Sequence, residues 1–226
     1  MKSDSKPAYK VVFEDEFVIV VNKLVKILIQ PSPKKEKNTL TSLLRQDLNV
    51  KVYPCHRLDR ETSGLIIYAK DNFCEKNIMD QFRRSLINKK YLCFVKGRLK
   101  RKKGLLEGEI LDKEGRRFGE KAKKAKTLYR VIKEFDKFSF LELTPFTGRT
   151  NQLRIQLADI GHPILGEDKY AFRRDFPLNF KRLALHASCL EFTHPRSRKK
   201  ISLEIELPYD MKSFLQNLFH PRSGTS

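Results

Sequence analysis

Several short segments of the chain have the hydrophobic pattern of β-strands. The stretch KVVFEDEFVIVVNK (10–23) contains two apolar runs on either side of Glu14–Glu16, which predicts a hairpin at the edge of a sheet. The run GLIIYA (64–69) is apolar throughout and rich in β-branched residues, as in a strand that is buried on both faces. KYLCFVKG (90–97) also has strand character.

Three later segments continue this pattern. TLYRVIKEF (127–135) and FSFLELTPF (138–146) flank a predicted turn at Asp136–Lys137, so we expect them to pair as a hairpin. ISLEIELP (201–208) alternates strictly between apolar and polar residues, which is typical of a strand with one solvated face. Its inward side chains should be Ile201, Leu203, Ile205 and Leu207.

Apolar residues at intervals of three or four predict helices between these strands. The first helix should cover Thr39–Leu48, with Asn38 or Thr39 as its cap. A second helix should follow Asp71, whose side chain can cap it. The buried face of this second helix should consist of Ile78, Phe82 and Leu86.

Two more helices are predicted over Arg149–Ile160, which ends at Gly161, and over 211–219. Strands outnumber helices and do not alternate with them regularly. The sequence therefore predicts an α+β fold with a mixed, largely antiparallel sheet and flanking helices.

The charge of the chain indicates a class of partner. Lysine and arginine number 47 against 27 aspartate and glutamate residues, a formal net charge of +20, so a polyanion such as RNA or DNA is expected. A basic stretch from Lys100 to Lys126 is either a solvated surface or an RNA contact. The amphipathic segment 211–219 is short and poor in basic residues, which argues against membrane binding.

The cysteines and the hydropathy profile indicate a cellular setting. The chain has four cysteines: Cys55, Cys74, Cys93 and Cys189. They lie far apart and form no Cys-x-x-Cys pair, so neither a zinc site nor a disulfide framework is expected. The polar start and the absence of a run of about 18 apolar residues predict a protein without a membrane span. We expect a cytoplasmic location with reduced thiols.

The segment HRLDRETSG (56–64) contains the first candidate for chemistry. A carboxylate at Asp59, close to Arg57 and Arg60, would stay ionised and fixed in direction, as a nucleophile or general base requires. The alternative is that Asp59 and Arg57 only close a turn. The order His-Arg-Leu-Asp, without a glycine-rich phosphate loop, excludes the catalytic loop of a protein kinase.

Two further segments carry candidate binding residues. In TGRTNQLRIQLADIGHPILGEDKY (147–170), Asn151 and Arg154 share a face near a helix start, where they could bind a carboxylate or a phosphate, or only face solvent. Tyr91 follows two lysines, so it could stack on an extruded base while the lysines hold phosphate, or it could belong to the core. His162 is interpreted as a loop-packing residue.

Together, three segments closely resemble the signature segments of the RluA-type pseudouridine synthases: CHRLDRETSGLIIYAK (55–70), KKYLCFVKG (89–97) and the segment 147–170. Weaker matches are EDEFVIVVNK (14–23) and LALHASCLEFTHP (183–195). The resemblance runs from about Val11 to Leu207. It implies the pseudouridine synthase fold with a central catalytic cleft, and the isomerisation of uridine in RNA without a cofactor or metal.

The resemblance also implies roles for single residues. Asp59 corresponds to the catalytic aspartate, and Arg57 to a residue that contacts RNA or helps to displace the target base. Tyr91 corresponds to the tyrosine that packs on the uracil, and Arg154 to the arginine that pairs with the aspartate. Two more residues of the Asp59 segment are candidates for substrate binding: Arg60 and Thr62.

The chain departs from the family pattern at Leu24, where proline is frequent, and at Asn151 and Gln156, where histidine is frequent. We expect a polar segment (1–10), a catalytic domain (11–219) that acts as a monomer, and a disordered tail (220–226). We also expect no small S4-type RNA-binding domain in front of the catalytic region.

The expected substrate is ribosomal RNA in preference to transfer RNA. An inactive RNA-binding or ribosome-assembly factor with the same fold is the alternative. A metal-dependent nuclease would need clustered carboxylates, and the sequence offers Asp59 without evident partners.

Overall fold

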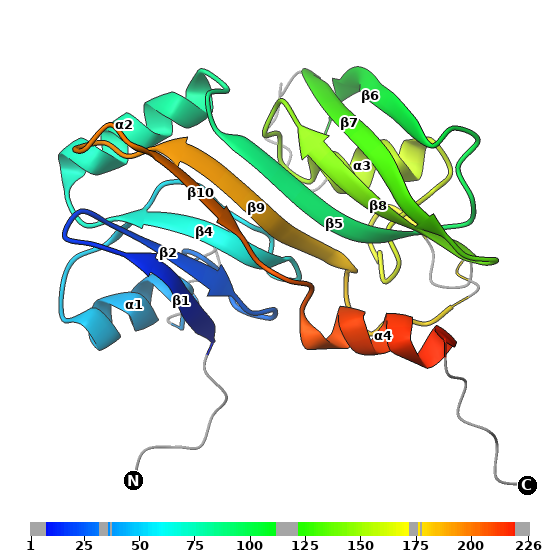
Figure 1. Ribbon diagram of the computed structural model, residues 1–226, viewed down its shortest axis with the longest axis horizontal. Helices are drawn as coiled ribbons and strands as arrows, with labels where there is room; N and C mark the ends of the chain where they lie inside the picture. The colour runs from blue at the N-terminus through cyan, green and yellow to red at the C-terminus, as the bar shows by residue number, and fades with distance from the viewer. Residues whose placement is uncertain are drawn as a thin grey trace, which may run out of the picture.

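The predicted mixed α+β fold is confirmed (Figure 1). The structure, a computed structural model, describes residues 8–31, 36, 38–111, 122–171, 176 and 178–219. Outside this range lie the expected tail (220–226), most of the polar start and the middle of the basic stretch. The helices are α1 (Leu40–Leu48), α2 (Asn72–Arg83), α3 (Gln152–Asp159) and α4 (Tyr209–Phe219).

The described strands form a ten-stranded sheet in the order β1-β2-β4-β9-β5-β8-β7-β6, with β3 beside β4 and β10 beside β9. All neighbouring strands are antiparallel except β4 and β9, which are parallel. The strands are β1 (Tyr9–Glu14), β2 (Val18–Lys23), β3 (Tyr53–Pro54), β4 (Ser63–Ala69), β5 (Asn88–Lys96), β6 (Lys103–Ile110), β7 (Lys123–Glu134), β8 (Phe138–Pro145), β9 (Leu185–Thr193) and β10 (Lys200–Glu204).

The apolar run of β4 is buried on both faces, as predicted. Ile66 and Tyr68 pack on the α1 side together with Leu40. Leu65 and Ile67 pack on the opposite side, where α2 lies. Both faces of this half of the sheet are therefore covered by a helix, which explains why its strands read as continuous apolar runs instead of alternating ones.

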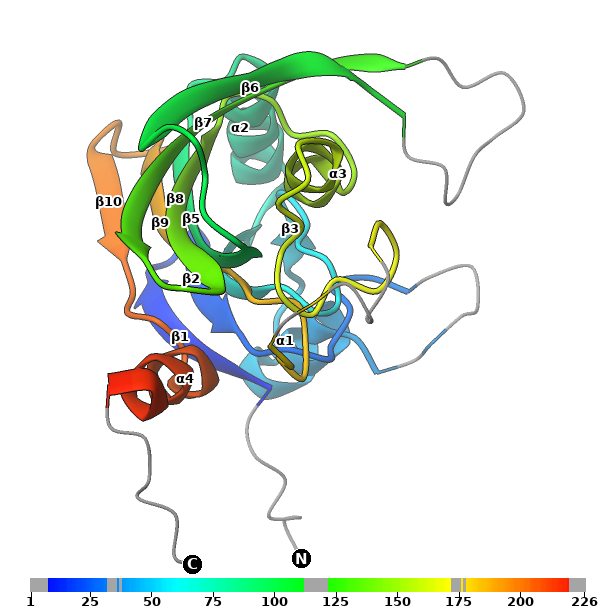
Figure 2. The ribbon, with the colours of Figure 1, turned by 90° about the vertical axis from the view of Figure 1, so that its right-hand side faces the viewer.

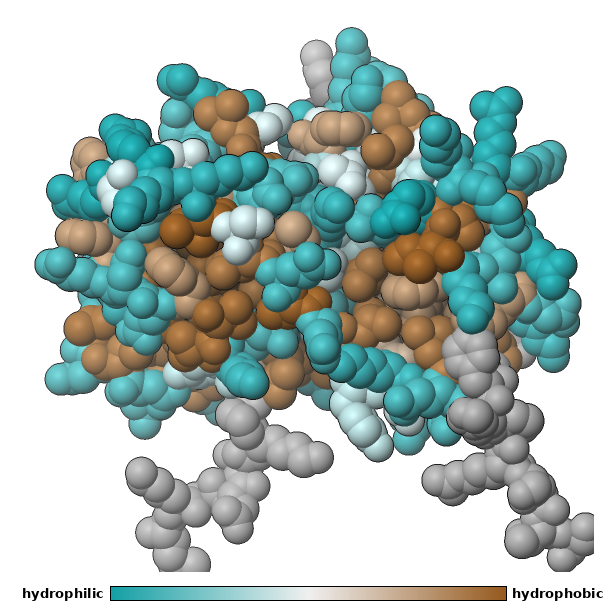
Figure 3. Space-filling model, viewed as in Figure 1, coloured by the Kyte–Doolittle hydropathy of each residue, from teal (hydrophilic) through white to brown (hydrophobic). Residues whose placement is uncertain are grey.

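The other half of the sheet curves around α3 (Figure 2). A large core cluster joins β5, β8 and β9 to α3 and α4, and it includes Phe94, which stacks on Phe214 of α4. On the face seen in Figure 3, hydrophobic side chains gather over the middle of the sheet and hydrophilic ones surround them.

The helix ends follow the predicted caps, with two corrections. The side chains of Thr39 and Asp71 cap α1 and α2. Leu86, predicted on the buried face of α2, is 65% exposed because the helix ends at Arg83. The helix α3 starts three residues later than predicted, since Asn151 adopts a left-handed conformation with a φ of 52° and bends the chain before it.

Strand β9 was missing from the predicted elements, although it lies at the centre of the sheet. Its buried residues include polar ones, so it has neither a continuous apolar run nor a clear alternation. It meets β4 at Gly64, whose φ is +120°, and a Cβ atom there would lie 2.2 Å from the carbonyl oxygen of Ala187. Only glycine allows this close approach of the two strands.

His186 of β9 makes stability depend on pH. Its Nε2 donates to the carbonyl of Glu206 (3.1 Å), which can only accept, and in the neutral form of this buried ring Nδ1 accepts from the hydroxyl of Ser63 (2.9 Å). Burial lowers the pKa of His186 to about 4. Below about pH 6.5 the unfolded chain therefore binds a proton that the folded chain does not, and the free energy of unfolding falls by on the order of 2 to 3 kcal/mol towards pH 4.

Urea unfolding between pH 7 and pH 4 measures this effect. His186→Gln should flatten the dependence, whereas His162→Gln, in a loop near the surface, should leave it unchanged. An equally steep dependence in both variants would show that another group is responsible.

Candidate functional site

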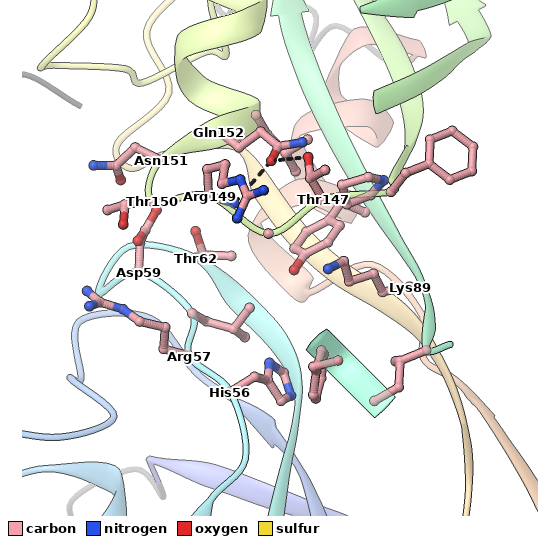
Figure 4. Close-up of a pocket in the computed structure, with 18 of the residues that line it drawn as sticks. His56, Arg57, Asp59, Thr62, Lys89, Thr147, Arg149, Thr150, Asn151 and Gln152 are labelled. Atoms are coloured by element: carbon pink, nitrogen blue, oxygen red, sulfur yellow. Dashed lines mark hydrogen bonds between the residues drawn. The ribbon is translucent and has the colours of Figure 1, made fainter. Parts of the chain in front are cut away.

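A cavity of about 490 Å³ lies between the two halves of the sheet. Its walls come from segments 55–62, 82–91 and 145–154, together with Leu185. Figure 4 shows Asp59 and Arg57 on one side and Lys89 on the other, with the loop before α3 above them. The three segments that carry the candidate residues in the sequence thus meet at one cavity.

Five of the six predicted site residues line this cavity: Arg57, Asp59, Thr62, Tyr91 and Arg154. Arg60 does not line it. The Arg60 guanidinium is exposed and lies 3.7 Å from Glu36.

Asp59 is half-buried in the turn that precedes β4, where its carbonyl accepts from the amide of Thr62 (3.1 Å). Burial raises the pKa of Asp59, and the charges of Arg154 and Arg57 oppose this increase without cancelling it. The carboxylate is therefore more basic than a free aspartate, while cations remain close to it.

Lys23 stabilises the turn that carries Asp59, a role that was not predicted from the sequence. Its side chain is fully buried, and its Nζ donates to the carbonyls of Leu24 (2.9 Å), Ile27 (3.2 Å) and Arg60 (3.1 Å). Burial lowers the pKa of Lys23 to about 7. Three carbonyls match the three donors of an ammonium group, so Lys23 fixes the Asp59 turn to β2. The position of this lysine at the end of an apolar strand is the feature of the sequence that could have indicated its burial.

Leu24 accounts for one departure from the family pattern. Its backbone amide donates to the carbonyl of Ala8 (3.0 Å), a bond that a proline could not make. The loop after Lys23 is thus held to the start of β1.

Arg154 is held by a buried carboxylate that the sequence did not single out. Its Nε and Nη2 donate to Oε2 and Oε1 of Glu167 at 2.7 and 2.5 Å, and Glu167 is fully buried. A Glu167 oxygen also accepts from the amides of Asp168 (3.0 Å), Lys169 (2.8 Å) and Tyr170 (3.3 Å). This bidentate pair fixes the direction of the guanidinium.

The predicted pairing of Arg154 with Asp59 stays a prediction. Within the described part of the chain, the Arg154 guanidinium donates hydrogen bonds to Glu167, Asp168 and Asn151. Arg154 nevertheless has the largest effect of any cation on the pKa of Asp59. The interaction between them is one of charge across the cavity.

A network of amides and hydroxyls shapes the loop before α3. Gln152 Oε1 accepts from the Thr147 hydroxyl (2.7 Å) and from the amide of Arg149 (3.1 Å), as Figure 4 shows. Gln152 Nε2 donates to the hydroxyl of Thr127 (2.9 Å), which in turn donates to Gln156 (2.7 Å). Gln156, a departure from the family pattern, therefore joins α3 to the β6–β7 hairpin and does not reach the cavity.

Tyr91 lies on β5 between two core clusters and also lines the cavity. Burial, with a further contribution from Asp59, raises the pKa of its phenol, which therefore keeps its proton at neutral pH. His56 lies nearby, accepts from the amide of Ile67 (3.1 Å), and has its pKa lowered to about 3 by burial. The ring of His56 is consequently neutral, with a structural role.

The cavity carries a strong excess of positive charge. Asp59 is the carboxylate among its described lining residues, against five cations: Arg57, Arg83, Lys89, Arg149 and Arg154. Elsewhere in the described part of the chain, no group of three or more His, Cys, Asp or Glu side chains could hold a metal ion. No described helix is long and apolar enough to cross a membrane.

Comparison with known proteins identifies the family. The family model described as RNA pseudouridylate synthase matches residues 17–159. A ribosomal large subunit pseudouridine synthase D of Nitrosomonas europaea is 31% identical over 96% of this chain and 67% of its own. The chain belongs to the RNA pseudouridylate synthase family. It is therefore an isomerase that acts on RNA, and the resemblance of its signature segments is confirmed.

Two further pseudouridine synthases match the chain. A tRNA pseudouridine synthase C of Haemophilus ducreyi is 32% identical over 85% of this chain and 88% of its own. The solved structure of human RNA pseudouridylate synthase domain containing 4 has a TM-score of 0.78 and 24% identity, and covers 92% of both chains. This structural likeness confirms the pseudouridine synthase fold.

Proposed function

We propose that this protein converts a specific uridine of a structured RNA into pseudouridine, with Asp59 as its essential carboxylate. The observation that carries the proposal is the position of Asp59, half-buried in a cationic cavity beside Tyr91 and across from a fixed Arg154. These are the residues to which the family resemblance assigns the chemistry.

The reaction breaks the bond between ribose C1′ and uracil N1, turns the ring, and joins C1′ to C5. The proton from C5 is lost and N1 gains one, so no group or electron is exchanged with another molecule. The enzyme must extrude the nucleotide from any stack, which costs a few kcal/mol, and retain the free base while it turns. A cavity of about 490 Å³ is of the size that encloses a small ligand.

Each proposed residue meets one requirement of this reaction. Asp59 acts as a nucleophile on the ring or the ribose, or removes a sugar proton; its raised pKa makes it a better base than a free aspartate. Tyr91 offers the aromatic ring of a neutral phenol, on which the uracil packs. Arg154, fixed by Glu167, stabilises negative charge on Asp59.

For the substrate we propose ribosomal RNA before transfer RNA. The relatives named above carry both substrate classes in their names, at 31% and 32% identity. The net charge of +20 suits contact with the phosphates of either class of RNA. Arg57 would then contact the RNA at the mouth of the cavity, where its exposed side chain lies beside Asp59.

Pseudouridine mapping of total RNA, with and without the gene, tests the proposal. We expect one or a few sites to disappear from ribosomal RNA, and to return with the wild-type gene but not with Asp59→Asn. Loss of sites from transfer RNA alone would show that the substrate is transfer RNA instead of ribosomal RNA. Unchanged maps, together with RNA binding by the purified protein, would favour the inactive RNA-binding factor.

A further inference from the structure

Lys89 is one of three cations of the cavity, with Arg83 and Arg149, to which the proposed chemistry gives no role. It extends from β5 into the cavity, on the side away from Asp59 (Figure 4). Lys90, next in sequence, faces the opposite side of the sheet and pairs with Glu142 (3.4 Å). Of the two lysines before Tyr91, the structure thus places only Lys89 in the cavity.

Lys89 differs from Arg83 and Arg154 because it has no carboxylate partner in the described part of the chain. Arg83 pairs with Asp80, and Arg154 pairs with Glu167. The Lys89 ammonium instead lies 5.7 Å from the ring centroid of Phe82. Its pKa is lowered by burial alone, without a contribution from an acidic group. A half-buried cation in this state gains strongly from an anion beside it.

The surroundings of Lys89 leave room for such an anion. A Cβ atom at Gly148 would lie 3.4 Å from the Lys89 Nζ, so the absence of a side chain there keeps the approach open. Lys89 and Tyr91 are two residues apart on one side of β5, about 7 Å along the strand. A single nucleotide can therefore reach both side chains.

We propose that Lys89 binds a phosphodiester next to the target uridine and so holds the extruded nucleotide in the cavity. This inference rests on the proposed function, because it places the uracil against Tyr91. A phosphate fits better than a carbonyl group of the base, since a phosphate carries a full negative charge and Lys89 has no carboxylate partner among the described residues. Lys89 would then affect RNA binding more than the chemical step.

The salt dependence of binding tests this without reference to activity. Binding of a 12-nucleotide single-stranded RNA with one uridine is measured at several salt concentrations in the Asp59→Asn background. Lys89→Met should weaken binding by about 10-fold and reduce the slope of log K against log salt by about 0.7. Lys89→Arg should keep the slope. Lys10→Met, which removes an exposed lysine of β1, should change neither quantity by as much.

A neutral methylphosphonate at the phosphate before or after the uridine identifies the partner. At one of these positions the methylphosphonate should weaken RNA binding by the wild-type protein about as much as Lys89→Met does. It should cause no further loss of binding in the Lys89→Met variant. Equal losses in both proteins at both positions would overturn the proposal, as would an unchanged salt slope. Lys89→Gln serves in the same tests if Lys89→Met does not fold.

The two proposals fail in different ways. An inactive protein that still shows the Lys89-dependent salt slope would contradict the proposed function and keep the phosphate site. An active protein in which Lys89→Met lowers the rate at saturating RNA, with the slope unchanged, would assign Lys89 to the base instead.

Discussion

Asp59→Asn is expected to abolish the conversion of uridine to pseudouridine, with a loss of at least about 10³-fold, or 4 kcal/mol in the barrier. An amide of the same shape keeps the packing of the turn but is neither a base nor a nucleophile. Binding of RNA should stay within about tenfold of wild type, because the cations that line the cavity are unchanged. Release of tritium from RNA labelled at uracil C5 measures the reaction directly.

Stability separates a chemical role of Asp59 from a structural one. Because burial raises the pKa of Asp59, its ionised form is disfavoured in the folded state, so Asp59→Asn should unfold at the same or a higher urea concentration at pH 7. Asp136→Asn, in the exposed β7–β8 turn, is the matched control and should remain active. Normal tritium release by Asp59→Asn would end the assignment of Asp59 as the catalytic residue.

Glu167→Gln should lower both stability and activity. It removes one partner of a buried ion pair, which typically costs about 3 kcal/mol or more. The released guanidinium of Arg154 should lose its fixed direction, and misplacement of a catalytic group by about 1 Å can slow a reaction 100-fold. Urea unfolding and single-turnover conversion of a uridine-containing RNA measure the two effects.

The pH profile shows whether Glu167 acts through Arg154. In Glu167→Gln the positive charge of Arg154 is no longer neutralised by Glu167. Arg154 should therefore lower the pKa of Asp59 further and move the acidic limb of the rate profile to lower pH. Glu206→Gln breaks an exposed pair with Lys212 and should change stability much less than Glu167→Gln does. A Glu167 variant with normal activity and an unshifted limb would leave Glu167 only a structural role.

The local pattern was sufficient where one physical effect dominates a segment. The fully apolar β4, the cap residues Thr39 and Asp71, and the β7–β8 hairpin were all predicted from sequence. Strand β9 was not, because its buried polar residues find partners from distant segments: His186 bonds to Ser63 and Glu206. Such partners are specified by the tertiary fold, so periodicity does not show them.

The same limit applies to the site. The pattern and the family resemblance singled out Asp59, Tyr91 and Arg154, which the structure brings to one cavity. The residues that hold them in place were missed, because the function of a buried side chain such as Glu167 or Lys23 depends on atoms far away in sequence. Arg60 shows that a charge near a reactive residue in sequence need not line the same cavity, and its predicted role in substrate binding stays a prediction.

The single parallel contact between β4 and β9 determines when the active site can form during synthesis. The strand order places β9 between the part of the sheet that carries Asp59 and the part that precedes Arg154. A nascent chain that ends before Leu185 already contains Asp59, Tyr91 and Arg154, but lacks the strand that brings its two walls together. Because this pairing joins residues far apart in sequence, assembly of the pocket is a late event in folding. Truncated products that bind RNA should therefore be unable to modify it.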